Sequence, residues 1–290
     1  MKNIISITNV LGIFVISCCF QCPVYAQIQT ETNTQLLLDS SQPTVLITGS
    51  NRGIGFAFVQ HYSKNGWNVI ATCRNPNKAD DLQLLMKNST NIFIEEMDVT
   101  DFEEINTLAQ KYQGYPIDVL VNNAGILGNV PKQSFGNLDY DLFQTVMAVN
   151  AFGPLKVAEA FADSVAISNQ KKIVTMTSGL GSFAIMGNFD RFFFYKMSKS
   201  AINMGVLTMN ASLKSKGIIA ALISPGMVDT KLLDESGYQG RNKISPEESV
   251  AGLVKIIAEI SLDTMKKTRG RPTNFDEVIQ IGRASCRERV

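Results

Sequence analysis

The most constraining feature of the sequence is a glycine-bearing turn between an apolar run and the segment that follows it. The apolar run 44–47 leads into Thr-Gly-Ser-Asn-Arg-Gly-Ile-Gly at 48–55, and Phe-Ala-Phe-Val at 56–59 continues the chain. This order predicts a buried strand that turns abruptly into a helix through three glycines. Such a turn is suited to hold nucleotide phosphates, because the helix N-terminus offers free N–H groups and a partial positive charge.

The three glycines of this loop have separate steric roles. Gly49 lets the chain leave the strand in a tight turn, and Gly53 removes a Cβ that would keep a pyrophosphate away from the backbone. Gly55 lets the new helix pack against the strand. A tight strand-to-helix turn also needs glycine for steric reasons alone, so the rest of the chain decides between these interpretations.

Composition limits the classes of protein that fit. The chain has 290 residues, 45% hydrophobic and 18% charged, which suits one globular α/β domain with additional segments at its ends. With a formal net charge of +1 the chain has no strong positive electrostatic potential that would attract nucleic acid, so no nucleic-acid partner is expected. His61 is the only histidine, which argues against a histidine metal site and a Ser-His-Asp triad. Only Cys73 falls within the expected fold, so no disulfide is expected.

The N-terminal segment 1–26 has the pattern of an export signal. Lys2 precedes an apolar stretch that begins at 10–16, and Val-Tyr-Ala at 24–26 offers a cleavage site. Export to a periplasm or the exterior is therefore expected. A lipoprotein signal ending at Cys18, an uncleaved membrane anchor and a misassigned start in a cytoplasmic protein are the alternatives. The apolar stretch is short for a membrane span, so none is expected in the mature chain. The polar segment 27–43 is expected to be a flexible lead-in.

The last ten residues, 281–290, follow no pattern set by the preceding chain. They correspond to a translated sequencing adapter, because ATC GGA AGA GCG TCG TGT AGG GAA AGA GTG encodes them in order. We therefore expect that the natural chain is cut off near Gln280 and that the residues after it are an artefact. A genuine basic tail is the alternative. The domain is expected to span residues 44–280.

Strands and helices alternate along that domain. The pattern predicts a single Rossmann-like, doubly wound parallel sheet with helices on both faces, and a ligand at the carboxyl ends of the strands. The expected strands are 44–47, 67–72, 92–97, 117–121, 172–177 and 218–223, with a faint one near 272–275. The expected helices are 53–65, 78–87, 102–112, 138–168 with a bend at its Gly-Pro pair, and 246–260. Residues 231–245 are expected to form a substrate lid.

Polar motifs stand at the ends of these strands. Arg74 follows the second strand, where an acidic residue would accept from the ribose of NAD, so Arg74 and Arg52 favour the 2′-phosphate of NADP(H) over NAD(H). Two solvated surface arginines are the alternative. Asn-Asn-Ala-Gly at 122–125 follows the fourth strand, and Ser178 follows the fifth. Tyr195 and Lys199 are four residues apart, which places both on one helix face.

Together these motifs resemble the classical short-chain dehydrogenase/reductase family, in particular its carbonyl-reductase-like branch that includes the C-factor and sniffer proteins. The resemblance covers the whole expected domain. It implies an NADP(H)-dependent oxidoreductase that transfers hydride between nicotinamide and a small carbonyl or alcohol. The implied catalytic residues are Asn150, Ser178, Tyr195 and Lys199. The implied cofactor-binding residues are Gly49, Asn51, Arg52, Gly53, Ile54, Gly55, Arg74, Asp98, Val99, Asn123, Ala124, Gly125, Tyr195, Lys199, Pro225, Gly226, Val228 and Thr230.

The resemblance also implies a role for each catalytic residue. Tyr195 is the acid in reduction and the base in oxidation. An ammonium of Lys199 roughly 4 Å away would contribute about 4 kcal/mol at an effective dielectric of about 20, which would lower the pKa of Tyr195 by roughly three. Ser178 would donate a hydrogen bond to the substrate oxygen, and Asn150 would position a water beside Lys199. Thr100 or Asp101 would cap the helix after the third strand.

Three further expectations concern partners. The aromatic run 192–194, with Phe183, Ile185 and Met186, forms either an apolar pocket mouth or part of the core. Family members pair through the two long helices after Asn123, which implies a homodimer or homotetramer. The alternative to an enzyme is an exported dinucleotide-binding protein that signals or binds a partner, with vestigial catalysis.

Overall fold

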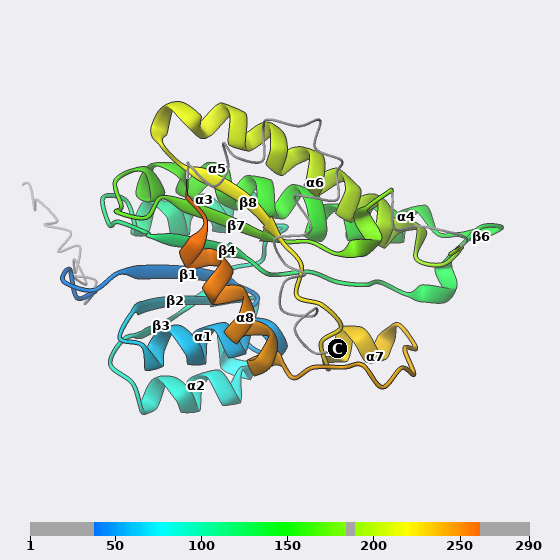
Figure 1. Ribbon diagram of the computed structural model, residues 1–290, viewed down its shortest axis with the longest axis horizontal. Coiled ribbons are helices and arrows are strands. Elements are labelled where there is room, and N and C mark those ends of the chain that lie inside the picture. The colour runs from blue at the N-terminus through cyan, green and yellow to red at the C-terminus, as the bar shows by residue number, and fades with distance from the viewer. Residues whose placement is uncertain (1–37, 184–188, 262–290) are drawn as a thin grey trace, which may run out of the picture. The chain divides into compact units, whose positions relative to one another are not determined.

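The computed structural model describes residues 38–183 and 189–261, and its centre is a six-stranded parallel sheet (Figure 1). The strand order is β3-β2-β1-β4-β7-β8, and every neighbouring pair in it is parallel. The strands are β1 (Thr44–Thr48), β2 (Asn68–Cys73), β3 (Ile92–Glu96), β4 (Val119–Asn122), β7 (Lys172–Met176) and β8 (Ile219–Ile223). The predicted doubly wound parallel sheet is confirmed.

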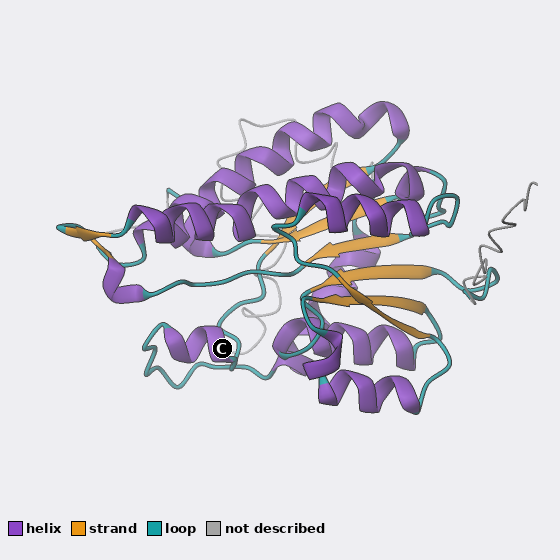
Figure 2. Cartoon of the chain, turned by 180° about the vertical axis from the view of Figure 1, so that it is seen from behind, coloured by secondary structure: helices purple, strands orange, loops and turns teal. Residues whose placement is uncertain are grey.

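Helices cover both faces of this sheet (Figures 1 and 2). One face carries α1 (Gly53–Lys64), α2 (Asp80–Lys87) and α8 (Pro246–Glu259). The other carries α3 (Phe102–Lys111), α4 (Tyr140–Met147), α5 (Gly153–Ala166) and α6 (Phe193–Leu213). Every residue of β1, β2, β4, β7 and β8 is buried, whereas the edge strand β3 is only partly so. Burial on both sides explains why these strands are continuous apolar runs without alternation.

The strand order reverses between β1 and β4, and this reversal places the candidate site. In open parallel sheets a ligand binds at the carboxyl ends of the strands where the order reverses. The loop 48–55 leaves β1 there, and the segment 122–125 leaves β4 beside it. The small hairpin of β5 (Gln133–Ser134) and β6 (Asn137–Leu138), and the short helix α7 (Lys231–Glu235), lie beyond this same edge (Figure 1).

The predicted bend in the helical region 138–168 is present, but its form differs from a simple kink. A π-helical turn, η3 (Ala148–Phe152), separates α4 from α5. A Cβ on Gly153 would lie 2.7 Å from the carbonyl oxygen of Val99, so glycine lets α5 begin against the chain that follows β3. Asn150 lies inside this turn and is 1% exposed.

Three local details correct or refine the expectations. Residues 231–245, which are expected to form a substrate lid, begin with the short helix α7, because Thr230 caps its start by accepting from the N–H of Leu233. Their role as a lid stays a prediction. Asp101 caps α3 by accepting from two N–H groups, as expected for Thr100 or Asp101. The β5–β6 hairpin was not expected at all. The short 3-10 turns are η1 (Pro76–Lys78), η2 (Val130–Lys132), η4 (Gly179–Gly181) and η5 (Lys214–Lys216).

Several expectations fall outside the described ranges. They are the export signal, most of the lead-in, the faint strand near 272–275 and the adapter-like end. They stay predictions. Within residues 38–183 and 189–261, no helix combines the length and apolar character that crossing a membrane requires.

Asp118 joins the amino ends of the central strands. Its carboxylate is 4% exposed and accepts from the N–H of Thr44 at 3.0 Å, and from those of Asn169 and Gln170 at 3.2 Å each. These three bonds tie the start of β1 to β4 and to the turn before β7. A buried carboxylate with three backbone donors is among the stronger polar contributions to stability.

We predict that Asp118→Ala lowers the free energy of unfolding by about 2–4 kcal/mol, because the buried N–H of Thr44 and two partly buried N–H groups lose their acceptor. Urea unfolding of the purified protein measures this. The control is Asp163→Ala, which removes a carboxylate whose side chain is 91% exposed and paired with Lys216 at 2.7 Å. That change is expected to cost less than about 1 kcal/mol. Equal losses in the two variants would contradict the role given to Asp118.

Candidate active site

The loop between β1 and α1 has the geometry expected of a phosphate loop. Gly49 has φ +68° and Gly53 has φ +54°, both in the left-handed region that favours glycine. A Cβ on Gly55 would lie 2.1 Å from the carbonyl oxygen of Gly49, so no larger residue fits there. At Gly53 a Cβ would meet the Thr230 methyl at 3.4 Å, which places the loop after β8 against the phosphate loop.

The start of α1 is suited to an anion. No side chain caps the helix at Arg52, and the first turn holds no acidic residue. Asn51 and Arg52 are both exposed. Ser50 holds this loop against the end of β2, because its N–H donates to the Thr72 carbonyl at 2.9 Å. Arg74, also exposed, comes two residues after Thr72, just beyond the end of β2. Because β1 and β2 are neighbouring strands, the two arginines expected to bind a 2′-phosphate, Arg52 and Arg74, follow adjacent strand ends.

Asn123 ties the exit of β4 to the exit of β1. The Thr48 hydroxyl oxygen accepts from the N–H groups of Asn123 and Ala124, both at 3.0 Å. In return the side-chain amide of Asn123 donates to the carbonyls of Thr48 at 2.9 Å and Gly49 at 3.1 Å. A Cβ on Gly49 would lie only 3.0 Å from the Ala124 Cα, so the two loops are in close contact.

Asn150 links the segment after β4 to helix α6. Its side-chain amide donates to the Ile126 carbonyl at 2.8 Å and to the Ser198 hydroxyl at 3.0 Å, while its Oδ1 accepts from the Ile126 N–H at 2.9 Å. Both amide hydrogens are therefore used by protein acceptors. A Cβ built on Gly125 would lie 3.3 Å from the Asn150 Oδ1 and 3.8 Å from the Lys199 Nζ, so these three residues meet.

Ser178, Tyr195 and Lys199 also come together. Ser178 follows β7, and its side chain accepts from the Leu180 N–H at 3.2 Å and lies near enough to the phenol of Tyr195 to influence the pKa of that group. The Lys199 Nζ lies 5.7 Å from the centre of the Tyr195 ring and donates to the Met176 carbonyl at 3.0 Å. Tyr195 is 8% exposed and Lys199 5%, so both react in an environment that excludes most water.

Burial sets the proton affinities of this pair. It raises the pKa of Tyr195 to about 12, with the nearby Ser178 side chain acting in the opposite direction. It lowers the pKa of Lys199 to about 8. The expected lowering of the Tyr195 pKa by Lys199 is thus not found, because burial of the phenol has the larger effect and raises the pKa instead. The phenol is protonated at neutral pH, which suits a proton donor.

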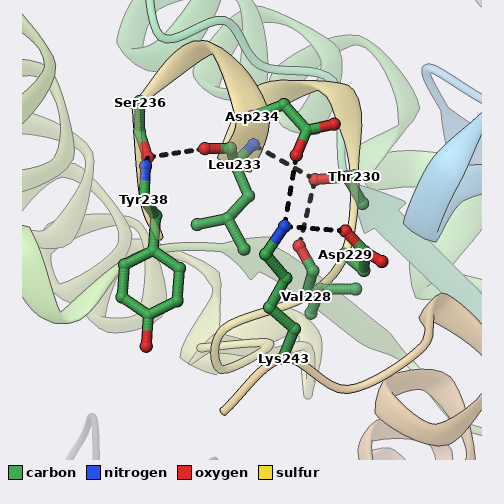
Figure 3. Close-up of polar contacts among 8 residues, drawn as sticks. All are labelled: Val228, Asp229, Thr230, Leu233, Asp234, Ser236, Tyr238 and Lys243. Carbon is green, nitrogen blue, oxygen red and sulfur yellow. Dashed lines mark hydrogen bonds and ion pairs between the residues drawn. The ribbon is translucent and has the colours of Figure 1, made fainter. Parts of the chain in front are cut away.

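The loop after β8 is held by a dense set of polar contacts (Figure 3). The Ser249 hydroxyl donates to the Pro225 carbonyl at 2.8 Å, and Gly226 follows with φ +81°. Val228 is buried and pairs with Ile244. Lys243 bridges Asp229 at 3.2 Å and Asp234 at 3.3 Å, which fastens α7 to the loop, as the dashed lines in Figure 3 show.

Asp98 and Val99 lie after β3, at the same edge of the sheet. The Asp98 carboxylate accepts from the N–H of Thr100 at 2.8 Å and from its hydroxyl at 2.7 Å. The N–H of Asp98 donates to Glu104 at 2.7 Å, and Val99 is 7% exposed. These bonds fix the turn at the position expected to border an adenine.

Two residues of the site were missed from the sequence. Ser198 accepts from Asn150 and donates to the Tyr195 carbonyl at 2.8 Å; its place just before Lys199 was an available signal. Gln133 is 0% exposed and accepts from the Tyr195 N–H at 3.0 Å. No pattern in the sequence pointed to it, because it lies in the unexpected hairpin 62 residues away.

Comparison with known proteins agrees with this geometry. Residues 43–239, more than half of the chain, match the family described as short chain dehydrogenase. The chain belongs to this family. It is also 35% identical to the short chain dehydrogenase gsfK of Penicillium aethiopicum over 231 residues, which cover 74% of this chain and 90% of the relative.

Two solved structures are similar to this dehydrogenase. One is the NADPH-bound carbonyl reductase from chicken fatty liver, with 28% identity and a TM-score of 0.70 over 77% of this chain and 93% of that one. The other is the carbonyl reductase Sniffer of D. melanogaster, with 27% identity and a TM-score of 0.68 over 77% of this chain and 94% of that one. The predicted likeness to the carbonyl-reductase branch is confirmed. The dehydrogenase is an oxidoreductase, and the non-enzymatic alternative is not favoured.

We predict that Lys199 makes stability pH-dependent. Its pKa is about 8 in the folded protein and 10.5 ordinarily, so the unfolded chain binds more protons between these values. The free energy of unfolding should therefore rise with pH across this window, by roughly 3 kcal/mol for this group. Urea unfolding at several pH values should show a more positive slope of stability against pH in the wild type than in Lys199→Met, because Cys73 and Tyr195, whose pKa values are raised by burial, act in the opposite direction in both proteins. The exposed control Lys214→Met should keep the wild-type slope; an unchanged slope in Lys199→Met would contradict the prediction.

Proposed function

We propose that this dehydrogenase reduces small carbonyl compounds, and oxidises the corresponding alcohols, with NADP(H) preferred over NAD(H). The observation that carries the proposal is the convergence of Ser178, Tyr195 and Lys199 at the carboxyl edge of the sheet, directly beside Gly125 and Asn150. Their elements, β7, α6, the β4 exit and η3, are separated along the chain and meet only at this edge.

The residues present fit a nicotinamide dinucleotide. Glycines leave the backbone of 49–55 open, the start of α1 has no acidic side chain, and two exposed arginines flank it. The loop 49–55 would hold the pyrophosphate, and Asp98 and Val99 the adenine. The segment 123–125, Tyr195 and Lys199 would border the nicotinamide ribose, and Pro225, Gly226, Val228 and Thr230 the carboxamide. When bound, this group supplies or accepts the hydride.

The preference for NADP(H) is supported by charge. Arg52 and Arg74 offer guanidinium groups at the position where the ribose 2′-substituent lies in dinucleotide folds, and neither Cys73 nor Asn75 supplies a carboxylate to accept from a free hydroxyl. The carbonyl reductase from chicken fatty liver, which is similar over most of this chain, has NADPH bound.

The protein's own residues then handle the proton. The Tyr195 phenol, neutral at pH 7, donates to the carbonyl oxygen of the substrate as negative charge develops there. The Ser178 hydroxyl, which lies near the phenol, donates to the same oxygen and stabilises that charge. Lys199 contributes a nearby positive charge while its contact with Met176 fixes its direction. Asn150 holds the segment 126–127 beside these groups.

An apolar wall around Tyr195 supports an apolar carbonyl substrate. Leu127 and Phe192 are buried against the ring of Tyr195, and Val130, Leu180 and Leu232 pack around them. Of the aromatic run, only Phe192 belongs to this wall. Phe194 packs against Phe143 on α4 and is therefore part of the core. Ile185 and Met186 lie outside the described residues.

We also propose pairing of two or four copies through α4, α5 and α6. Three apolar side chains on α6 and one on η3, which leads into α5, are between 37% and 56% exposed. They are Phe152, Met197, Met204 and Leu207. Export through residues 1–26 remains a proposal that rests on the sequence alone.

We predict that the protein binds NADPH at least about tenfold more tightly than NADH, because each arginine adds a charge-assisted contact to the 2′-phosphate. Fluorescence titration with both cofactors measures this. Arg52→Ala and Arg74→Ala should each weaken NADPH binding by about tenfold and leave NADH within about threefold. Lys64→Ala, at the far end of α1, is the control. An equal loss of affinity for NADPH and NADH would show that these arginines do not recognise the 2′-phosphate.

We predict that Tyr195→Phe reduces turnover by at least about a hundredfold, because the proton donor is lost, while the NADPH dissociation constant stays within about threefold. A panel of small aldehydes and ketones, followed by the loss of NADPH absorbance, supplies the assay. Tyr140→Phe, which alters an exposed tyrosine, should keep full activity. Retained turnover in Tyr195→Phe would exclude the proposed acid.

A further inference from the structure

Helix α6, which carries Tyr195 and Lys199, begins without a cap of its own. Phe192 precedes it with φ +64°, a left-handed conformation, and provides no side-chain hydrogen bond to the first turn. The first N–H groups of a helix have no partner within the helix. Phe194 and Tyr195 are 2% and 8% exposed, so these groups have little access to solvent. A buried N–H without an acceptor would cost about 1–3 kcal/mol.

Gln133 supplies the acceptor from the β5–β6 hairpin. Its Oε1 accepts from the Tyr195 N–H at 3.0 Å, and its Nε2 donates to the Leu127 carbonyl at 2.8 Å. The side chain is 0% exposed, so both ends of the amide are used inside the protein. A Cβ on Gly128 would lie 3.0 Å from that Nε2, so glycine leaves the room that the amide needs.

The amide thereby joins α6 to the same segment that Asn150 holds. Asn150 bonds both backbone groups of Ile126 and also the Ser198 hydroxyl, which in turn donates to the Tyr195 carbonyl at 2.8 Å. The backbone of Tyr195 is thus tied to segment 126–127 twice, through its N–H by Gln133 and through its carbonyl by Ser198. Leu127 also packs against the Tyr195 ring.

We propose that Gln133 is a positioning residue that fixes the first turn of α6, and with it the phenol of Tyr195, against the segment that follows Gly125. This inference rests on the proposed role of Tyr195 as the proton donor. Gln133 acts on the backbone of Tyr195 and its contacts lie within the protein. A displacement of about 1 Å at a reacting group can cost roughly a hundredfold in rate, so a fixed helix start has a direct kinetic consequence.

The test begins with Gln133→Met, which keeps the volume of the side chain and removes both hydrogen bonds. With the best carbonyl of the panel, kcat should fall by at least about tenfold, while the NADPH dissociation constant stays within about threefold. The amide hydrogen of Tyr195 should exchange with solvent at least about tenfold faster, because its acceptor is gone. The matched control is Asn68→Leu. Asn68 is 2% exposed and uses both ends of its amide on Asp39 at the opposite edge of the sheet.

A double-mutant comparison separates positioning from general stability. In the Tyr195→Phe background, with enzyme in excess, Gln133→Met should change the residual rate by less than about threefold, because the group that it positions is already absent. An equal loss in both backgrounds, or an unchanged kcat in the single variant, would overturn the inference. If Gln133→Met shows no cooperative unfolding, Gln133→Glu, which keeps the acceptor for Tyr195, enters the same comparison. Full turnover by Tyr195→Phe would instead refute the proposed proton donor.

Discussion

The reciprocal hydrogen bonds between Thr48 and Asn123 are the contact on which the site depends. They join the exits of β1 and β4, the two strands between which the sheet order reverses. On one side of this contact the chain forms the phosphate loop, and on the other it continues through Gly125 to Ile126 and Leu127. Asn150 and Gln133 then hydrogen-bond this second segment and also hydrogen-bond residues of α6, so they link the two. The loop 49–55 and helix α6, to which we assign cofactor binding and proton donation, are therefore placed relative to one another through a continuous series of short polar contacts.

Burial determines the chemistry that this arrangement performs best. A phenol with a pKa near 12 holds its proton at neutral pH, and an ammonium with a pKa near 8 is still mostly charged there. That combination favours proton donation to a carbonyl oxygen, which is reduction. In the opposite direction Tyr195 must lose its proton first, so alcohol oxidation gains from alkaline conditions. The apolar wall of Leu127 and Phe192 lies beside the phenol and supports the proposed preference for an apolar carbonyl.

The sequence predicted the elements whose signals are periodic or local. Buried strands read as unbroken apolar runs because helices cover both faces. Polar motifs at their carboxyl ends pointed to Ser178 and Asn123, and the four-residue spacing on a helix pointed to Tyr195 and Lys199. Gln133 could not be found in this way, because the two-residue strand β5 has no periodicity and its partner is distant in the chain. The pKa of Tyr195 was also beyond sequence reasoning, since it depends on the burial of the phenol and on the nearby Ser178 side chain. The π-helical turn around Asn150 required the packing of Gly153 against Val99.

Transfer of an isotope label would test the proposed chemistry at the reacting atoms. The protein is incubated with a ketone from the panel and with NADPH that carries deuterium on the reactive face of nicotinamide C4, and the product is analysed by mass spectrometry. The account predicts an alcohol with one deuterium on the former carbonyl carbon, formed by the wild type. The experiment is repeated with NADPH that carries deuterium on the other face of nicotinamide C4. If neither labelled cofactor gives a deuterated alcohol, hydride does not pass directly from nicotinamide to the carbonyl carbon, and the account is contradicted.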